Sequence, residues 1–235
     1  MLTIVQPKVY VESFDGVTLC KKIERMARIC YKSEHKQTDE SYKTIIANML
    51  KRGHFSPIEH EKISVIFVCD RGVSHELVRH RIASFSQEST RYCNYSKNQF
   101  GNRIQVIEPF GFLKDLAAYK SWYKGCESAA SAYFEVLAQS GKPEWARSVL
   151  PNSLKTEVAT TFNLREWRHF FSLRADKAAH PQMRQVAVPL LKHFQNKIPI
   201  LFDDIEWDKS FPQEYEAKII ESEDLLFEVT EESLI

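Results

Sequence analysis

Apolar residues recur every three or four positions over several long stretches of this chain. In residues 16–31, Leu19, Ile23, Met26 and Ala27 lie among lysines and arginines, a pattern typical of an amphipathic helix with a charged outer face. The same period predicts further helices over residues 39–52, 113–139, 144–150, 164–174 and 181–197. Thr38 is expected to cap the second of these helices and Gly53 to end it.

Shorter runs of β-branched and aromatic residues predict strands between the helices. They cover residues 2–11, 62–69, 103–107 and 156–162. Asp70 or Ser74 is placed to cap a short helix that ends at residues 79–81. Asn163, with Glu166 three positions later, is placed as a variant capping box for the next long helix. The mixture of long helices and short strands indicates an α+β fold.

Composition narrows the class of protein. Of the 235 residues, 43% are hydrophobic, enough for a sizeable core, and 32 Lys and Arg against 31 Asp and Glu leave a net charge of +1. That balance argues against a dedicated nucleic-acid-binding protein, and no apolar run is long enough to span a membrane. Five cysteines without a C-x-x-C pair favour free thiols and a cytoplasmic location, and argue against structural zinc.

The chain is expected to form one compact domain followed by an acidic tail. We place the domain at residues 1–210 and the tail at 211–235, because residues 221–235 contain six acids and no Lys or Arg. The chain contains only 7 glycines and no Gly-rich fingerprint, so a dinucleotide-binding Rossmann site is not expected.

Residues 79–92 hold the densest cluster of candidate chemistry. Three arginines, Arg79, Arg81 and Arg91, offer planar guanidinium groups beside short hydroxyl and amide side chains. Such a set suits a phosphate, because guanidinium groups bind its oxygens in pairs and hydroxyls satisfy the remaining acceptors. The alternative is an ordinary helix end followed by a Ser-rich turn. Glu76, three residues before Arg79, shares its predicted helix face. Two interpretations stay open for this pair: a salt bridge that holds Arg79 in place, or a solvated surface pair that contributes little.

Residues 54–60 bring His54, Glu59 and His60 close together and raise the possibility of a metal site. The spacing is not that of an H-E-x-x-H motif, because Ser64 stands where the second histidine is needed. Pro57 favours a turn that leads into a strand instead. No metal is therefore expected.

The order Arg79-His80-Arg81, then Ser89, then Thr90-Arg91-Tyr92 resembles the signature of the flavin-dependent thymidylate synthases. Residues 53–60, 146–152 and 162–176 resemble further segments of the same family. The resemblance implies a single α+β domain with a small, mostly antiparallel sheet flanked by long helices. It also implies a homotetramer with active sites shared between subunits. The implied reaction converts dUMP to dTMP, with FAD as cofactor, NADPH as reductant and methylenetetrahydrofolate as one-carbon donor.

The resemblance also assigns residues to ligands. The residues it implies for dUMP are Glu76, Arg79, Gln87, Ser89, Thr90, Arg91, Arg147 and Arg174. Those it implies for the flavin are His54, Ser56, Glu59, His80, Arg81, Ile82, Asn163, Arg165 and His169. Arg174 and Ser89 are the catalytic candidates: Arg174 polarises the uracil ring, and Ser89 is expected to donate a hydrogen bond, since the sequence supplies no base to make it a nucleophile.

Two positions depart from the family pattern. Glu76 stands where relatives often have Gln, and Ala178 replaces a flavin-contacting histidine, for which His180 is the candidate substitute. Two rival functions stay open on the residues alone. One is an RNA- or nucleotide-binding protein that uses the arginines as a phosphate clamp without flavin. The other is a structural oligomer whose arginines form interface salt bridges.

Overall fold

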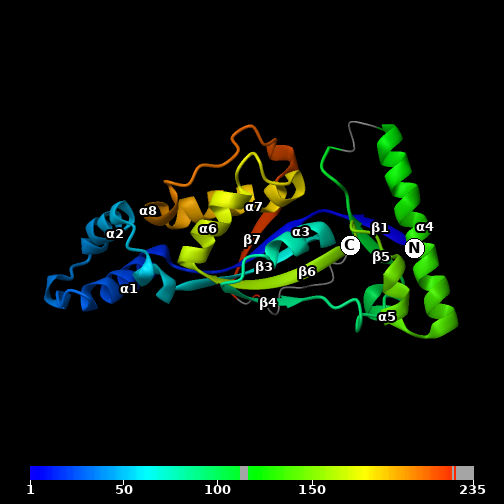
Figure 1. Ribbon diagram of the computed structural model, residues 1–235, viewed down its shortest axis with the longest axis horizontal. Coiled ribbons are helices and arrows are strands. Elements are labelled where there is room, and N and C mark those ends of the chain that lie inside the picture. The colour runs from blue at the N-terminus through cyan, green and yellow to red at the C-terminus, as the bar shows by residue number, and fades with distance from the viewer. Residues whose placement is uncertain (112–115, 224, 226–235) are drawn as a thin grey trace.

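A five-stranded sheet carries the fold. Figure 1 shows the computed structural model, in which residues 1–111, 116–223 and 225 are described. The strand order is β4-β6-β3-β2-β7, and every pairing is antiparallel except β2 with β7. The strands are β2 (Lys8–Glu12), β3 (Lys62–Asp70), β4 (Ala83–Gln87), β6 (Lys155–Asn163) and β7 (Lys218–Ser222). The expected mostly antiparallel sheet is therefore present.

Helices pack on one face of this sheet, where α3, α6 and α7 lie side by side (Figure 1). Burial along β6 alternates strictly, which is the period-2 pattern of a strand with one face in the core. The helices are α1 (Gly16–Ile29), α2 (Ser41–Arg52), α3 (Arg71–Leu77), α4 (Leu116–Ser140), α5 (Pro143–Ala146), α6 (Leu164–Arg174), α7 (Pro181–Lys197) and α8 (Pro199–Phe202). Residues 113–115, the start of the helix predicted over residues 113–139, lie outside the described residues.

The main core is built around Trp167 on α6. Its ring lies 4.4 Å from that of Phe162 and packs edge-on to Phe170, and all three side chains are fully buried. The indole Nε1 donates to the backbone carbonyl of Ile63 at 3.1 Å. This bond satisfies the one polar atom of a buried tryptophan and fixes α6 against the sheet.

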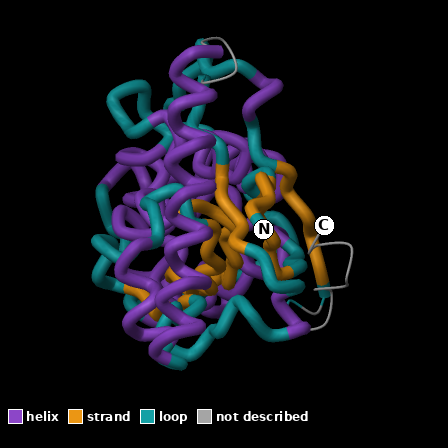
Figure 2. Tube along the Cα trace, turned by 90° about the vertical axis from the view of Figure 1, so that its right-hand side faces the viewer, coloured by secondary structure: helices purple, strands orange, loops and turns teal. Residues whose placement is uncertain are grey.

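A second, smaller core lies beside α4, at the end of the molecule opposite α1 and α2 (Figure 1). Figure 2 is turned so that this end faces the viewer. Here β1 (Leu2–Val5) pairs in parallel with β5 (Ile104–Ile107), and Tyr133 of α4 is fully buried. The single strand predicted over residues 2–11 is therefore wrong. It breaks at Gln6 and Pro7, and its two halves belong to different sheets. Proline lacks the N–H that a continuous ladder needs.

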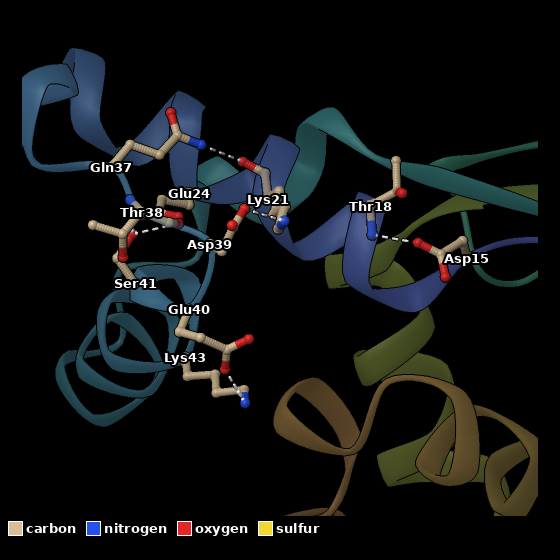
Figure 3. Close-up of polar contacts among 10 residues, drawn as sticks. All are labelled: Asp15, Thr18, Lys21, Glu24, Gln37, Thr38, Asp39, Glu40, Ser41 and Lys43. Carbon is tan, nitrogen blue, oxygen red and sulfur yellow. Dashed lines mark hydrogen bonds and ion pairs between the residues drawn. The ribbon is translucent and has the colours of Figure 1, made fainter.

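Local capping sets the ends of α1 and α2 (Figure 3). Asp15 caps α1 by accepting from the backbone N–H of Thr18 at 2.7 Å. The predicted cap of α2 at Thr38 is wrong, because the helix begins at Ser41, whose Oγ accepts from the Thr38 N–H at 2.8 Å. Gly53 ends α2 in the left-handed conformation, with φ of +70°, as predicted.

The end of the chain departs from the predicted division at residue 210. Within the expected tail, β7 pairs in parallel with β2 and forms an edge of the main sheet, so this part of the tail belongs to the fold. Residues 224 and 226–235 of the tail lie outside the described residues. Among the helices that are described, none is both long and apolar enough to cross a membrane.

Candidate active site

A pocket of about 650 Å³ opens where β6 passes into α6. Its size falls in the range of small-molecule and cofactor sites. The residues that line it are Glu59, Arg79, His80, Arg81, Ile82, Asn163, Arg165, Glu166 and His169. Seven of the nine residues expected to contact flavin are in this set. The other two, His54 and Ser56, do not line the pocket.

The first turn of α6 forms one wall because Asn163 caps the helix as predicted. Its Oδ1 accepts from the backbone N–H of Glu166 at 2.8 Å. The reciprocal half of a capping box does not form, because the Glu166 carboxylate bonds instead to His80. The helix N-terminus favours this buried negative charge through its dipole.

His80 lies between two charged partners. Its Nδ1 is 2.9 Å from Oε1 of Glu166, and its Nε2 accepts from Nε of Arg174 at 3.2 Å. Its ring stacks on Phe162 and meets Phe170 edge-on. Burial lowers the pKa of His80, although the adjacent Glu166 carboxylate opposes that shift. The imidazole is therefore held neutral at physiological pH.

Arg174, the residue expected to polarise uracil, closes the same network. Its Nη1 donates to Oε2 of Glu76 at 2.8 Å, and Oε1 of Glu76 lies 3.6 Å from Nδ1 of His180. Within the described part of the chain, Glu76 forms no ion pair with Arg79; its partners there are Arg174 and His180, so neither interpretation of the Glu76–Arg79 pair holds. The helix ends at Leu77, so Arg79 is not on the helical face that carries Glu76.

A second group of predicted residues surrounds the turn after β4. Nη1 of Arg147 lies 3.4 Å from Oγ1 of Thr90, and Oγ of Ser89 accepts from the backbone N–H of Arg91 at 3.3 Å. The guanidinium of Arg91 stacks over Tyr92, 5.2 Å from the ring centroid. Hydroxyls and guanidinium groups at one turn form an arrangement suited to a phosphate.

Gln87 leads into this turn from the end of β4. Its Nε2 donates to Oγ of Ser74 at 2.9 Å and to Oγ1 of Thr156 at 3.2 Å. These bonds fix its amide inside the protein. The sequence patterns predict no strand here, but Ala83–Gln87 pairs with β6 and forms an edge of the main sheet.

Glu88 anchors the same turn and was not among the predicted site residues. Its carboxylate accepts from the hydroxyl of Tyr95 at 2.8 Å and from Nζ of Lys155 at 3.4 Å. Burial raises the pKa of Tyr95, and the Glu88 charge adds to the shift. The tyrosine is therefore a permanent donor that holds Glu88, and with it the backbone that carries Ser89.

The pocket lined by Arg79, Arg81 and Arg165, called the first pocket below, carries positive charge at its rim. Arg79 and Arg81 are exposed, and neither has an ion-pair partner within the part of the chain that the structure describes. Arg165 pairs with Glu59 across the opening. Ile82 is 69% exposed beside the two free arginines. An apolar surface next to cationic groups matches the chemistry of a flavin, which joins a ring system to phosphates.

The ligand atoms of His80, Glu166 and His169 lie within 4.8 Å of one another, a spacing that a metal ion can bridge. The donor set does not fit a metal, however. Both ring nitrogens of His80 are engaged, and one of them faces the Arg174 cation. A metal ion on Nε2 would have to displace that guanidinium and accept its repulsion.

Comparison with known proteins decides the family. The family model described as Thymidylate synthase complementing protein matches residues 19–200. The flavin-dependent thymidylate synthase of Pyrococcus abyssi is 32% identical over 182 residues, which cover 77% of this chain and 73% of that protein. This chain belongs to the flavin-dependent thymidylate synthase family. The enzyme of the same name from Mycolicibacterium vanbaalenii is 30% identical over 205 residues, which cover 78% of each chain.

A solved structure agrees at the level of the fold. The UMP/dUMP methylase PolB from Streptomyces cacaoi, bound with 5-Br dUMP, superimposes with a TM-score of 0.71 at 22% identity. The match covers 85% of this chain and 95% of PolB. The resemblance to this family therefore extends over most of the chain and is not confined to the signature at residues 79–92.

Sequence reasoning did not identify Glu166 as a site residue, although it lines the pocket of this flavin-dependent thymidylate synthase family member. The sequence pattern places it only in the capping box of α6. The burial of its carboxylate against His80, 86 positions away, has no signal in a local pattern. Arg79, which the resemblance assigns to dUMP, lies in the wall of this pocket.

Proposed function

We propose that this protein catalyses the flavin-dependent reductive methylation of dUMP to dTMP. One observation carries the proposal: seven of the nine positions at which the family resemblance implies flavin contact line a single pocket. The network of Arg174 begins in that same pocket, at His80. The pocket therefore joins the residues assigned to the cofactor to the arginine assigned to the uracil ring.

The residues of the first pocket would hold FAD. Arg79 and Arg81 offer unpaired guanidinium groups to its phosphates, and Ile82 offers an apolar contact to its rings. When bound, the flavin supplies the reducing equivalents, which come from NADPH, while methylenetetrahydrofolate supplies the carbon. The protein's own task is to orient these molecules and exclude water from their contact.

The substrate dUMP is assigned to the second group of residues and to Arg174. Ser89, Thr90, Arg91 and Arg147 hold the phosphate and sugar, and Ser89 acts as a hydrogen-bond donor rather than as a nucleophile. Arg174 faces the negative charge that develops on a uracil carbonyl oxygen during the reaction. A preorganised donor in a water-poor site stabilises such charge more than water does.

The active sites are shared between subunits of a homotetramer in this proposal. The separation of the two residue groups supports it. Within the described residues, the pocket lining includes none of Ser89, Thr90, Arg91 and Arg147. A second copy of the chain that contributes its phosphate-binding turn would complete the site. A cytoplasmic location stays a prediction from the sequence; all five cysteines are free thiols.

The visible absorption spectrum of the purified protein tests the proposal directly. We expect flavin bands that shift when dUMP is added, and dTMP formation when NADPH and methylenetetrahydrofolate are supplied. A protein that contains no flavin and takes up none from added FAD would refute the proposal. Binding of RNA or free nucleotides by that flavin-free protein would then favour the phosphate-clamp alternative.

A further inference from the structure

Glu166 and Arg174 occupy the two ends of α6 and are joined by a single side chain. Eight residues of helix span about 12 Å, too far for a direct contact between the two charges. His80 bridges this gap, with Nδ1 at 2.9 Å from the Glu166 carboxylate and Nε2 at 3.2 Å from Nε of Arg174. All three groups therefore share one hydrogen-bonded chain.

The chemistry of the partners fixes the proton on His80. The Nε–H of Arg174 can only donate, so the Nε2 atom facing it must be an acceptor. The ring proton then lies on Nδ1, where the Glu166 carboxylate accepts it. A ring with its proton on Nε2 would set two donors against each other and leave Glu166 without its bond.

We infer that Glu166 is a positioning residue, which holds His80 in the Nδ1–H tautomer and thereby orients the guanidinium of Arg174. The inference rests on the proposed function for the role of Arg174 toward uracil, but the relay itself is a property of the protein alone. Glu166 does not touch the substrate in this account. It acts through His80.

Burial gives the relay its strength. His80 is 4% exposed and Glu166 is 6% exposed, so water cannot replace a lost partner at low cost. The rings of Phe162 and Phe170 hold the imidazole plane in place. Because the aromatic contacts fix the ring, a change at Glu166 alters the proton position more readily than the ring position.

Charges around His80 explain its response to acid. Glu166, His169 and Arg174 face it from α6, and Glu76 of α3 faces the far side of Arg174. Protonation would place an Nε2–H against the Arg174 cation. Burial is the main cause that lowers the pKa of His80, and the Glu166 charge partly offsets it. Neutralising Glu166 should therefore lower that pKa further.

Two substitutions separate positioning from simple structural support. Glu166→Gln keeps an oxygen that accepts from Nδ1–H but removes the charge, whereas Glu166→Leu removes the acceptor. Asp204→Asn is the matched control, because Asp204 pairs with Arg168 of the same helix without reaching His80. Nitrogen-15 NMR of labelled histidine and arginine side chains reads the His80 tautomer and the Arg174 Nε–H in the protein without added substrates.

We expect the Nδ1–H tautomer in the unmodified protein, in Asp204→Asn and in Glu166→Gln, with a lower His80 pKa in Glu166→Gln. In Glu166→Leu the buried Nδ1–H has no acceptor, so the ring proton should move to Nε2, where it repels the Arg174 Nε–H and displaces the signal of that group. In the enzyme supplied with flavin and substrates, dTMP formation should fall roughly tenfold to a hundredfold in Glu166→Leu. In Glu166→Gln the rate should stay close to that of the unmodified protein, and the acid limb of its pH–rate profile should move to lower pH.

An unchanged tautomer in Glu166→Leu would overturn the inference, as would an unshifted His80 pKa in Glu166→Gln. The second variant keeps the test decisive if Glu166→Leu does not fold. Failure of the proposed function looks different. A protein with the expected tautomers and shifts but without flavin or dTMP formation would retain the relay and refute the assigned reaction.

Discussion

The Glu76 carboxylate reduces the positive charge that Arg174 can present to a substrate, and its neutralisation should strengthen dUMP binding. The two groups are 2.8 Å apart at their closest atoms, and their side chains are 30% and 21% exposed. Glu76→Gln keeps the size of the side chain and an oxygen that accepts from Arg174. The substitution therefore changes the charge and preserves the contact.

The expected magnitude follows from this geometry. Unit charges about 4 Å apart interact by about 4 kcal/mol at an effective dielectric constant of about 20. Partial exposure and desolvation reduce the net effect of such a pair to about 1 kcal/mol. We assume that Glu76 weakens the interaction of Arg174 with dUMP by this same free energy of about 1 kcal/mol. Neutralising Glu76 then lowers the dUMP dissociation constant roughly fivefold. The free energy of unfolding should fall by no more than about 1 kcal/mol.

Isothermal titration of dUMP into the flavin-loaded protein measures this change, and urea unfolding measures the cost in stability. Glu40→Gln is the control, because it neutralises an exposed carboxylate that pairs with Lys43, far from the site (Figure 3). Weaker dUMP binding in Glu76→Gln would refute the reasoning. It would show that the carboxylate contacts the substrate directly instead of competing for Arg174.

Three further results are expected. Arg91→Ala and Arg174→Ala should each lower dTMP formation roughly tenfold to a hundredfold, because each removes one charge-assisted contact; near-normal turnover in both would contradict the site assignment. Replacement of each cysteine in turn should leave turnover of the folded protein largely intact, because burial raises the thiol pKa of Cys20 to about 12 and also raises those of Cys69, Cys93 and Cys126. Complete loss of turnover at one cysteine would revive covalent catalysis. The pKa of His80 lies below its ordinary value of 6.5, so as the pH falls the unfolded state binds this proton before the folded state does. The free energy of unfolding should therefore decrease as the pH falls below about 6.5, and this decrease should be less steep in His80→Asn than in the unmodified protein.

The sequence could predict what depends on near neighbours. Asn163 caps α6 through a residue three positions away, and Gly53 ends α2 through its own backbone conformation. The family signature likewise located most of the pocket, since seven of its nine expected flavin contacts do line it. These features could be predicted because each depends either on a contact between residues close in the sequence or on a motif that recurs throughout a protein family.

Predictions failed where tertiary packing chooses between partners that are chemically equivalent. Two arginines are candidate partners for Glu76: Arg79, three positions away in the sequence, and Arg174, 98 positions away. In the structure Glu76 pairs with Arg174. The selection is made by the end of α3 at Leu77, which turns Arg79 out toward the pocket. Charge pairing by sequence spacing assumes that the helix continues, and here it does not.

Arg174 is held by enough contacts to orient it while part of its guanidinium stays available. Arg174 has one carboxylate on one side and a neutral histidine on the other, and that histidine is kept neutral by its burial. The guanidinium has five N–H groups, and three are used by these two neighbours. Two N–H groups remain for a substrate oxygen. A site that held Arg174 by fewer contacts would leave it free to turn toward solvent, whereas one that used all five would leave nothing for uracil.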